Sequence, residues 1–544
     1  MMGRKERRFV PLEHLTLEDL VPMDHFYRQL DRTLDLSFVR ELVAPCYAGG
    51  GRPSIDPVVF FRLQLILFFE GLRSERQLLR VLADRLAARW YLGYDLGEPL
   101  PDHSSLSKIR QRYGLAVFRR FFEEIVERCA QAGLVWGREL YMDATKVVAD
   151  ASVDSITPRF AVAARAHVED LFAQDAAAGG PLGPVPTGEP PAPPVAIGPT
   201  ATGVDATDLA AANAARHDWI AAAGRQDRTR CDPRYVRTAD LVVSTTDPDA
   251  THLRQRDGVR LGYQDHYMVD GGQARIILAV VVAPAEVPED YPAYDLLWRA
   301  RFRWQLRPRQ ATGDKAYGTV ALIRALEEQG VRAYIPLPDY DGRTPLFGKR
   351  DFVYDPQHDT YTCPGGTTLA FARLMKGERL RVYRAEAAIC NRCPLKRQCT
   401  ESSRGRTVAR SYDEAYLDRV RAYHQTEPYK KALRKRCVWV EPLFAEAKDW
   451  HGLRRFRLRR LWRVNMEALR IAAGQNLKRL LSWRGWGRRP WPGGAPGLHL
   501  GHAAAPNPRV LPESWLVVWL VWRPLEPGTP LATPSASRTG ARAA

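Results

Sequence analysis

The sequence contains no apolar run long enough to cross a membrane. Its longest late apolar run, residues 515–522, has eight residues, whereas a membrane-spanning helix needs roughly 20. The first ten residues are basic and polar, unlike a secretory signal. We therefore expect a protein that is neither exported nor inserted in a membrane.

Cysteine and acidic residues are both scarce. Four of the eight cysteines lie within residues 363–399, unlike the evenly distributed disulfide framework of small secreted domains, so we expect a reducing cytoplasm. The 62 Asp and Glu residues face 80 Lys and Arg residues, for a net charge of +18. This excess favours a polyanionic partner, nucleic acid before an anionic membrane surface.

The remaining composition is that of an ordinary globular protein. Apolar residues make up 45% and aromatic residues 10% of the 544 residues, which excludes wholesale disorder and fibrous repeats. The length predicts about three folded units. No internal repeat of the kind that builds solenoid proteins is present.

Residues 1–138 are predicted to form an all-helical domain. Apolar residues recur at helical spacing from Asp56 to Leu82, with a break near Gly71, which predicts a helix, a turn and a second helix. A further basic helix contains Arg110 and Arg112. Two interpretations remain open: a helix-turn-helix domain whose arginines contact DNA, or a plain helical bundle with a basic exposed face.

A mixed α/β core is predicted after this domain. Residues 139–152 are expected to form a strand that carries Asp143. The following elements are expected to be a hairpin over 262–270 and 275–283, a helix over 295–302, a strand ending at Asp314, a helix over 320–329 and a strand over 331–336. Strands that first pair and then alternate with helices indicate a mixed sheet with flanking helices.

Two segments are too rich in Pro, Gly and Ala to form a packed core. Residues 171–230 are predicted to be a disordered insertion and residues 485–544 a disordered tail. The core is assigned to 139–170 and 231–354, a small cysteine-bearing insertion to 355–409, and C-terminal core helices with a basic patch to 410–484.

Asp143 and Asp314 are the first candidate catalytic residues. A carboxylate in or at the end of a core strand is costly unless a cation neutralises it. Mg²⁺ prefers such hard oxygen ligands, and two such ions can stabilise the attacking and leaving oxygens of a phosphodiester. The alternative is that each aspartate is an ordinary capping or turn residue.

Glu441 is the candidate third carboxylate. Pro442 follows it and is tolerated only in the first turn of a helix, so Glu441 is expected at a helix N-terminus, where the helix dipole favours its ionised form. Lys448 lies two turns later on nearly the same face, whereas Glu446 is rotated away by roughly 140°. The alternative is that Glu441 and Lys448 are an ordinary exposed pair.

Eight short motifs, in order, resemble the bacterial insertion-sequence transposases of the DDE type. They are GRPSID at 51–56, SERQ at 74–77, RWYLG at 89–93, DATKVVADAS at 143–152, DPDA at 247–250, GYQDHYMVD at 262–270, GDKAYG at 313–318 and EPLFAEAK at 441–448. The resemblance covers residues 10–482. It implies a helical N-terminal domain and a ribonuclease-H-like catalytic domain.

The resemblance also implies roles for individual residues. Asp143, Asp314 and Glu441 would hold Mg²⁺ or Mn²⁺, as two ions, and Lys448 would contact DNA. A second group would support the site, although for His266 a purely structural role stays open: Tyr263, His266 and Asp270.

The chain departs from the family pattern near these residues. The family often has Asn where Asp150 stands. It commonly has a Tyr and an Arg upstream of the glutamate. At those two positions this chain has Arg434 and Cys437, and Arg436 lies one residue before the position of the family's Arg. The three carboxylates are nevertheless intact.

Four cysteines have the spacing of a metal site. They are Cys363, Cys390, Cys393 and Cys399, and a proline follows two of them. Four thiolates suit a closed, structural Zn²⁺ site. The alternative is a small insertion with reduced cysteines.

A dense basic segment follows Lys448. Residues 451–489 contain twelve Lys or Arg and a single acidic residue, which favours salt-dependent binding of DNA phosphates, although a solvated basic face is the alternative. The predicted DNA contacts in this segment are Arg454, Arg455, Arg457, Arg459 and Arg460.

Together these features predict a transposase that cuts DNA at element ends with water and then joins the 3′-hydroxyl ends to target DNA. The resemblance implies at least a homodimer that is associated with the nucleoid and has no membrane partner. Two alternatives stay open, a catalytically inactive DNA-binding derivative and an endonuclease that does not join DNA.

Overall fold

The computed structural model describes residues 15–48, 50, 54–158, 242–339, 341, 344–375 and 379–486. The described residues up to Leu481 form one compact unit. The predicted disordered insertion at 171–230 lies outside the described residues, as does the predicted tail beyond residue 486.

The N-terminal region is helical, as predicted. Its helices are α1 (Leu17–Leu20), α2 (Phe26–Thr33), α3 (Phe38–Val43), α4 (Pro57–Phe69), α5 (Glu75–Asp84), α6 (Leu86–Leu92) and α7 (His103–Gln131). Side chains cap three of them: Asp56 accepts from Val58 N at 2.8 Å, Ser74 from Gln77 N, and Asp102 from Ser104 N. These caps satisfy backbone N–H groups that a helix start leaves free.

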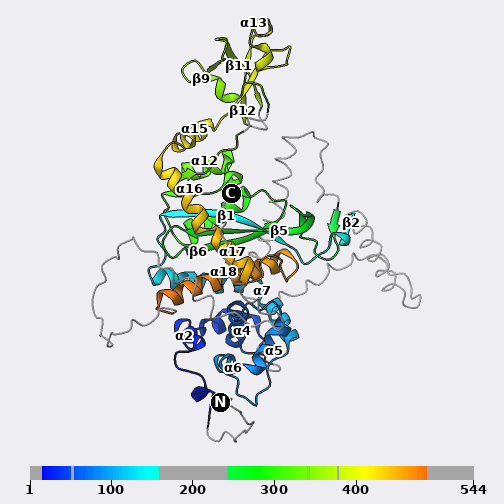
Figure 1. Cartoon of the computed structure of the whole chain (residues 1–544), viewed down its shortest axis with the longest axis vertical. Helices are drawn as coiled ribbons and strands as arrows, with labels where there is room; N and C mark the ends of the chain where they lie inside the picture. Colours follow the sequence, from blue (N-terminus) through cyan, green and yellow to red (C-terminus); the bar gives the residue numbers. More distant parts are fainter. Residues whose placement is uncertain are drawn as a thin grey trace, which may run out of the picture. The chain divides into compact units, whose positions relative to one another are not determined.

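A mixed sheet forms the centre of the unit (Figure 1). Its strands are β1 (Glu139–Val148), β4 (Thr251–Gln255), β5 (Gly258–Asp270), β6 (Ile277–Pro284), β7 (Gln310–Thr312) and β8 (Arg332–Tyr334). The order is β4-β5-β1-β7-β8, and β6 also pairs with β5. Strand β1 is antiparallel to β5 and parallel to β7, so the predicted hairpin and the predicted strand carrying Asp143 are confirmed.

Helices α11 (Asp290–Trp298), α12 (Val320–Glu328), α16 (Glu427–Trp439), α17 (Glu441–Trp450) and α18 (Leu461–Trp483) surround this sheet. Figure 1 shows α16 and α17 running across one side of β1 and β5. The start predicted for α11, residue 295, is wrong by five residues. Pro292 falls in its first turn, where no backbone N–H is needed.

Helix α18 covers the free edge of β6. The Asn465 side chain accepts from Val282 N at 2.9 Å and donates to Val282 O at 3.0 Å. Asn476 makes the same pair of bonds with Ile277, at 2.9 and 2.8 Å. These two side chains therefore satisfy backbone groups that an edge strand leaves unpaired.

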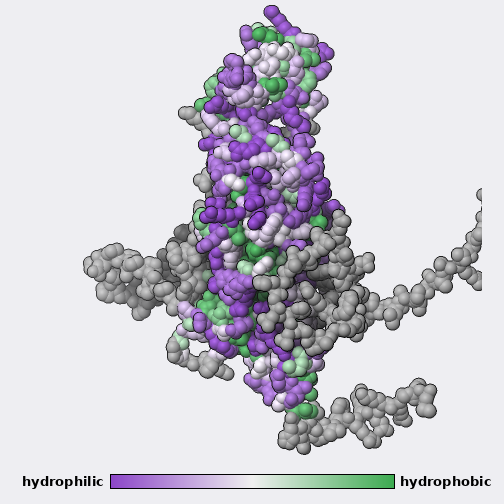
Figure 2. All heavy atoms as spheres, turned by 90° about the vertical axis from the view of Figure 1, so that its left-hand side faces the viewer, coloured by the Kyte–Doolittle hydropathy of each residue, from purple (hydrophilic) through white to green (hydrophobic). Residues whose placement is uncertain are grey.

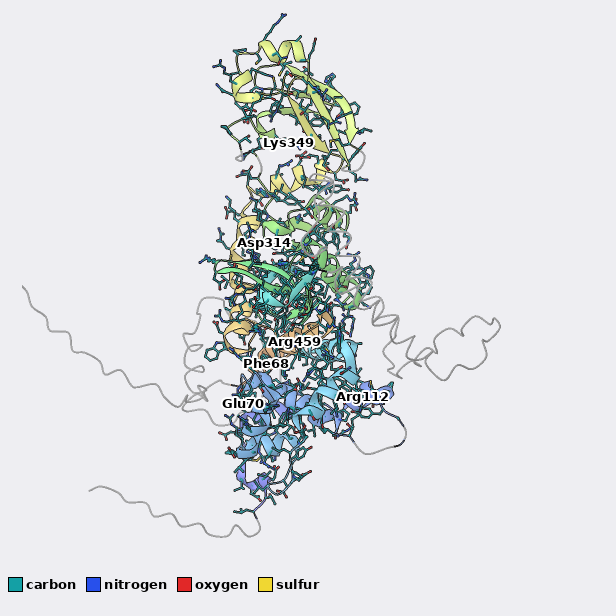
Figure 3. All side chains as sticks on the ribbon, turned by 90° about the vertical axis from the view of Figure 1, so that its right-hand side faces the viewer. Phe68, Glu70, Arg112, Asp314, Lys349 and Arg459 are labelled. Atoms are coloured by element: carbon teal, nitrogen blue, oxygen red, sulfur yellow. The ribbon has the colours of Figure 1, made fainter. Side chains whose placement is uncertain are left out.

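Helix α4 of the N-terminal region also contacts this part of the chain. The imidazole of His451 stacks on the Phe68 ring with centroids 3.8 Å apart, and a Cβ added to Gly474 would lie 2.4 Å from that ring. The close approach thus requires glycine at position 474. Figure 3 shows Phe68 near Arg459, where the N-terminal helices approach the core.

The cysteine segment forms a second, five-stranded antiparallel sheet that the sequence patterns did not predict. Its strands are β9 (Val353–Asp355), β10 (Thr360–Thr362), β11 (Thr368–Met375), β12 (Leu380–Ala385) and β13 (Thr407–Ser411), with the short helices α13 (Ala387–Arg392) and α14 (Lys396–Cys399).

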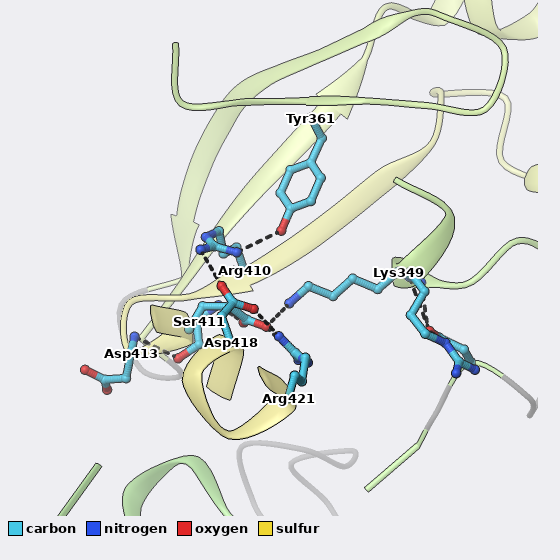
Figure 4. Close-up of polar contacts among 10 residues, drawn as sticks. Lys349, Tyr361, Arg410, Ser411, Asp413, Asp418 and Arg421 are labelled. Carbon is cyan, nitrogen blue, oxygen red and sulfur yellow. Dashed lines mark hydrogen bonds and ion pairs between the residues drawn. The ribbon is translucent and has the colours of Figure 1, made fainter. Parts of the chain in front are cut away.

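Helix α15 (Glu414–Tyr423) follows this sheet and is tied to it by ion pairs (Figure 4). The buried Glu414 contacts Lys349 at 2.8 Å and Arg421 at 2.9 Å. Arg410 of β13 contacts Asp418 at 3.1 Å. These contacts fix the end of the second sheet against α15.

The surface of the described residues is mostly hydrophilic in the view of Figure 2, with apolar side chains in small groups. In the part of the chain that the structure describes, no helix combines the length and the apolar character that crossing a membrane requires.

Candidate active site

Asp143 lies in the middle of β1, on the face of the sheet that α17 covers. It pairs with Tyr267 of β5, and the Tyr267 ring stacks on Phe444 of α17 at 4.3 Å. Asp143 is only 8% exposed. Burial is the main cause that raises the pKa of its carboxyl to about 6; the charges of Asp314 and Glu441 contribute to the rise and Arg436 opposes it.

Asp314 lies level with Asp143, two residues after the end of the neighbouring strand β7. Tyr141 of β1 pairs with Thr312 of β7 in parallel register, so Asp143 and Asp314 each come two residues later in adjacent segments. Asp314 also caps a short helical turn, because its side chain accepts from Ala316 N at 2.8 Å. The two aspartates are thereby brought together, as predicted.

Glu441 begins α17, as Pro442 predicts, and its side chain is exposed. Arg436, from the last turn of α16, connects it to Asp143. The guanidinium Nη1 lies 2.9 Å from Asp143 Oδ2, and Nη2 lies 3.7 Å from Glu441 Oε1. Arg436 therefore joins Asp143 and Glu441, and Asp314 lies close enough for its charge to act on Asp143, although the three carboxylates of the described chain are not already arranged to hold a metal ion.

A fourth carboxylate, Glu289, was not found from the sequence. It directly precedes α11 and is largely buried. Burial raises the pKa of Glu289 to about 7, and the negative charges of Asp314 and Asp143 add to the effect. Its only local signal is its place at a helix start, which many glutamates share.

His266 packs beneath the site. Because it pairs with Ala144, it points to the face opposite Asp143. Its Nδ1 lies 3.5 Å from the hydroxyl of the buried Tyr317, and burial lowers the pKa of His266 to about 3. The placement fits the structural alternative for this histidine.

Tyr263 and Asp270, the other predicted supporting residues, organise the backbone around the site. The Tyr263 hydroxyl donates to Asp247 at 2.9 Å, and Asp247 also accepts from Arg460 N at 2.9 Å. Asp270 accepts from the backbone N–H groups of Trp136, Gly137 and Gly272.

Lys448 lies above a buried acid that the sequence reasoning missed. Asp265 is fully buried, and neither of its carboxylate oxygens has a hydrogen-bond partner within the described residues. Burial raises the pKa of Asp265 well above its usual range, and the charge of Lys448 opposes the rise. Burial lowers the pKa of Lys448 itself.

The basic segment after α17 pairs with the end of β1. Phe456 N donates to Val148 O at 2.9 Å. This pairing brings two of the predicted DNA contacts, Arg455 and Arg459, to Asp150 at 2.7 and 3.0 Å. Both guanidinium groups are at least half exposed.

The other predicted DNA contacts have different surroundings. Arg454 is exposed and contacts Asp449, and Arg112 is exposed over the Tyr47 ring. Arg457 lies 3.5 Å from Glu75. The backbone of Arg460 is held by Asp247, as described above.

Arg110 is buried, contrary to the exposed role predicted for it. Its guanidinium contacts Glu75, which is also buried. Burial lowers the pKa of Arg110 to about 9. The sequence could not reveal this, because Glu75 lies on a different helix. The placement removes Arg110 from the set of exposed arginines.

The four predicted zinc ligands line one pocket. Cys363, Cys390, Cys393 and Cys399 are free thiols. Thr367 N donates to the sulfur of Cys363 at 3.3 Å, and Arg406 N donates to that of Cys390 at 3.4 Å. In the described parts of the chain, however, no three His, Cys, Asp or Glu side chains are already arranged to hold a metal ion.

Two family models match the chain. Residues 15–112 match a model described as "Transposase domain (DUF772)", and residues 362–481 match one described as "Transposase DDE domain". The second range contains Glu441, whereas Asp143 and Asp314 lie outside both ranges. These matches confirm the resemblance to DDE transposases that the motifs indicate.

The chain also matches the structure of a piggyBac transposase synaptic complex with hairpin DNA. The identity is 10%, the match covers 84% of this chain and 74% of the other, and the TM-score is 0.33. A search of curated proteins found no match.

Proposed function

We propose that this chain is an insertion-sequence transposase whose catalytic residues are Asp143, Asp314 and Glu441. The observation that carries the proposal is the placement of Asp143 and Glu441 on either side of the Arg436 guanidinium, with Asp314 close enough for its charge to act on Asp143. A cluster of this kind suits metal-dependent phosphoryl transfer. The two transposase family models support the same reading.

The central sheet supports a ribonuclease-H-like catalytic domain. Strands β1, β5 and β6 are antiparallel neighbours, and β7 and β8 continue the sheet parallel to β1. This arrangement places the end of β7 beside the middle of β1. Asp143 of β1 and Asp314, two residues after β7, are therefore neighbours, and α17 supplies the glutamate.

The donor set fits Mg²⁺ or Mn²⁺. Asp143, Asp314 and Glu441 offer hard oxygen ligands, and the contact of Arg436 with two of them supports a place for positive charge. When bound, such an ion polarises a phosphodiester oxygen and lowers the pKa of the attacking water. Two ions are expected, as for other enzymes that displace phosphodiester oxygens.

The protein's own residues position the DNA. Lys448 and the exposed guanidinium groups of Arg455 and Arg459 bind backbone phosphates beside the carboxylates. Arg454, Arg457, Arg460 and Arg112 extend this basic surface. In cleavage, water attacks the phosphorus and loses a proton to solvent, the bond to the 3′ oxygen breaks, and that oxygen takes up a proton to leave as a 3′-hydroxyl beside a 5′-phosphate. In joining, the released 3′-hydroxyl attacks a target phosphodiester in the same way.

The test is cleavage and joining of a labelled duplex that carries the element's own ends, with Mg²⁺ or Mn²⁺ present. The wild type is compared with Asp143→Ala and Asp314→Ala, and DNA binding is measured in parallel. Products that require metal and disappear in both variants, with binding retained, support the proposal. Binding without cleavage in the wild type would favour an inactive DNA-binding derivative, and cleavage without joining an endonuclease. A transposase that pairs two DNA ends is expected to act as a homodimer or larger oligomer.

We also propose a structural Zn²⁺ site on Cys363, Cys390, Cys393 and Cys399. The shared pocket and the two N–H···S hydrogen bonds support it, because such bonds favour thiolate sulfur. Zinc would draw the four sulfurs into a tetrahedral set. Purified protein should contain about one zinc per chain, and Cys393→Ser should lose it. Metal-free protein with normal stability would contradict the proposal.

A further inference from the structure

The candidate active site contains a cation that belongs to the protein. Arg436 is only 15% exposed at its side chain, and its two terminal nitrogens face different carboxylates, Asp143 at 2.9 Å and Glu441 at 3.7 Å. A guanidinium is planar and carries several donors in a rigid fork. The single Arg436 side chain can therefore contact two carboxylates at once.

The two acids that Arg436 contacts carry the same charge and come from different elements, β1 and α17. A positive charge between them offsets their mutual repulsion.

Arg436 uses the oxygen that a metal ion would need. Asp143 Oδ1 already accepts from Ala144 N at 2.9 Å, so Oδ2 is the oxygen that faces the site, and this atom contacts Arg436. Carboxylate oxygens bind Mg²⁺ at about 2.0 to 2.1 Å. An ion bound to Asp143 Oδ2 and Glu441 would therefore overlap the guanidinium.

We propose that Arg436 is an internal competitor of the catalytic metal: it neutralises Asp143 and Glu441 in the metal-free protein and must withdraw before an ion binds there. The inference rests on the proposed function for the identity of the metal site. If Arg436 competes with the metal, its removal strengthens metal binding. If it merely oriented the carboxylates, its removal would weaken metal binding.

The neighbouring Arg434 offers a matched control. It lies on the same helix, its side chain is 70% exposed, and its nearest acid is Glu427 at 3.9 Å. Removing either arginine lowers the net charge of the protein by the same amount. Only Arg436 contacts the candidate ligands, so general electrostatics cannot account for a difference between the two variants.

The experiment measures Mn²⁺ binding to the DNA-free full-length protein, by electron paramagnetic resonance of the free ion. Arg436→Gln is expected to bind Mn²⁺ about tenfold more tightly than the wild type, the size of coupling usual for charges in contact. Arg434→Gln should match the wild type. Equal or weaker binding by Arg436→Gln would overturn the inference.

Glu441→Gln separates this inference from the proposed function. If Glu441→Gln weakens Mn²⁺ binding but Arg436→Gln leaves it unchanged, the metal site stands and the competition does not. If Glu441→Gln leaves Mn²⁺ binding unchanged both in the wild type and in Arg436→Gln, the proposed metal site and the competition by Arg436 are both wrong. Should Arg436→Gln not fold, Arg436→Lys replaces it, because lysine keeps the charge but loses the forked donors. Its gain in Mn²⁺ affinity is expected to be smaller than that of Arg436→Gln. Mn²⁺ should raise its unfolding temperature more than that of the wild type.

Discussion

Replacing Asn476 with leucine tests how α18 completes the central sheet. Asn476 and Asn465 are 476 − 465 = 11 residues apart on the helix, and their partners Ile277 and Val282 are 282 − 277 = 5 residues apart on β6. At about 1.5 Å per helical residue and about 3.3 Å per strand residue, both spacings equal about 16.5 Å. The distance between the two asparagines along α18 therefore equals the distance between their partners along β6.

The expected cost follows from the lost hydrogen bonds. Asn476→Leu leaves the N–H and the C=O of Ile277 buried without a partner. Each unsatisfied group costs about 1 to 3 kcal/mol, and the apolar leucine recovers part of it, so we expect a net loss of about 3 kcal/mol. Because the unfolding entropy of so large a unit is about 0.8 to 1 kcal/mol/K, that loss lowers the unfolding temperature by about 3 to 4 °C.

Thermal unfolding followed by circular dichroism measures the effect, with Asn391→Leu as the control. Asn391 is exposed, donates to Ser403 O at 2.7 Å and accepts from Lys396 Nζ at 2.9 Å; because both bonds lie at the surface, its replacement should change stability by no more than about 0.5 kcal/mol. Equal unfolding temperatures for the two variants would refute the claim that α18 satisfies the edge of β6.

Three further predictions follow from other parts of the structure. Mn²⁺ binding should strengthen as pH rises through about 6, because Asp143 must lose its proton to bind a metal; calorimetry that finds the same affinity on both sides of this pH would contradict it. Asp265→Asn should raise the unfolding temperature, and the gain should grow with pH: burial raises the pKa of Asp265, so ionisation favours the unfolded chain above the unfolded-state pKa. A gain that shrinks with rising pH would show that Lys448 already pairs with it. Gly474→Ala should cost about 1 to 3 kcal/mol, since its Cβ would lie 2.4 Å from the Phe68 ring; an unchanged unfolding temperature would mean that α4 and α18 are not in close contact.

Local signals predicted much of the site. Proline after Glu441 fixed the start of α17, and the alternation and turn residues around Asp270 predicted the β5–β6 hairpin. The strand carrying Asp143 was recognised from its apolar flanks. Each of these features depends on neighbouring residues in the chain, which is why a sequence pattern carries them.

Features that depend on distant partners could not be predicted. Arg434 and Arg436 look alike in the sequence, and only the packing of α16 against β1 decides that Arg436 reaches Asp143. The same holds for Arg110, whose burial depends on Glu75. Strands β9 and β10 of the second sheet have only three residues each, too few for a local pattern to mark them.

The central claim is that Glu441 and the two aspartates form a catalytic site, and one isosteric pair of variants tests it most directly. Glu441→Gln and Glu427→Gln each replace an exposed glutamate at a helix start with a neutral amide. Cleavage of a labelled duplex carrying the element ends, with Mn²⁺, is measured for both. The account predicts that cleavage disappears with Glu441→Gln and persists with Glu427→Gln. Cleavage by Glu441→Gln at the wild-type rate would contradict it.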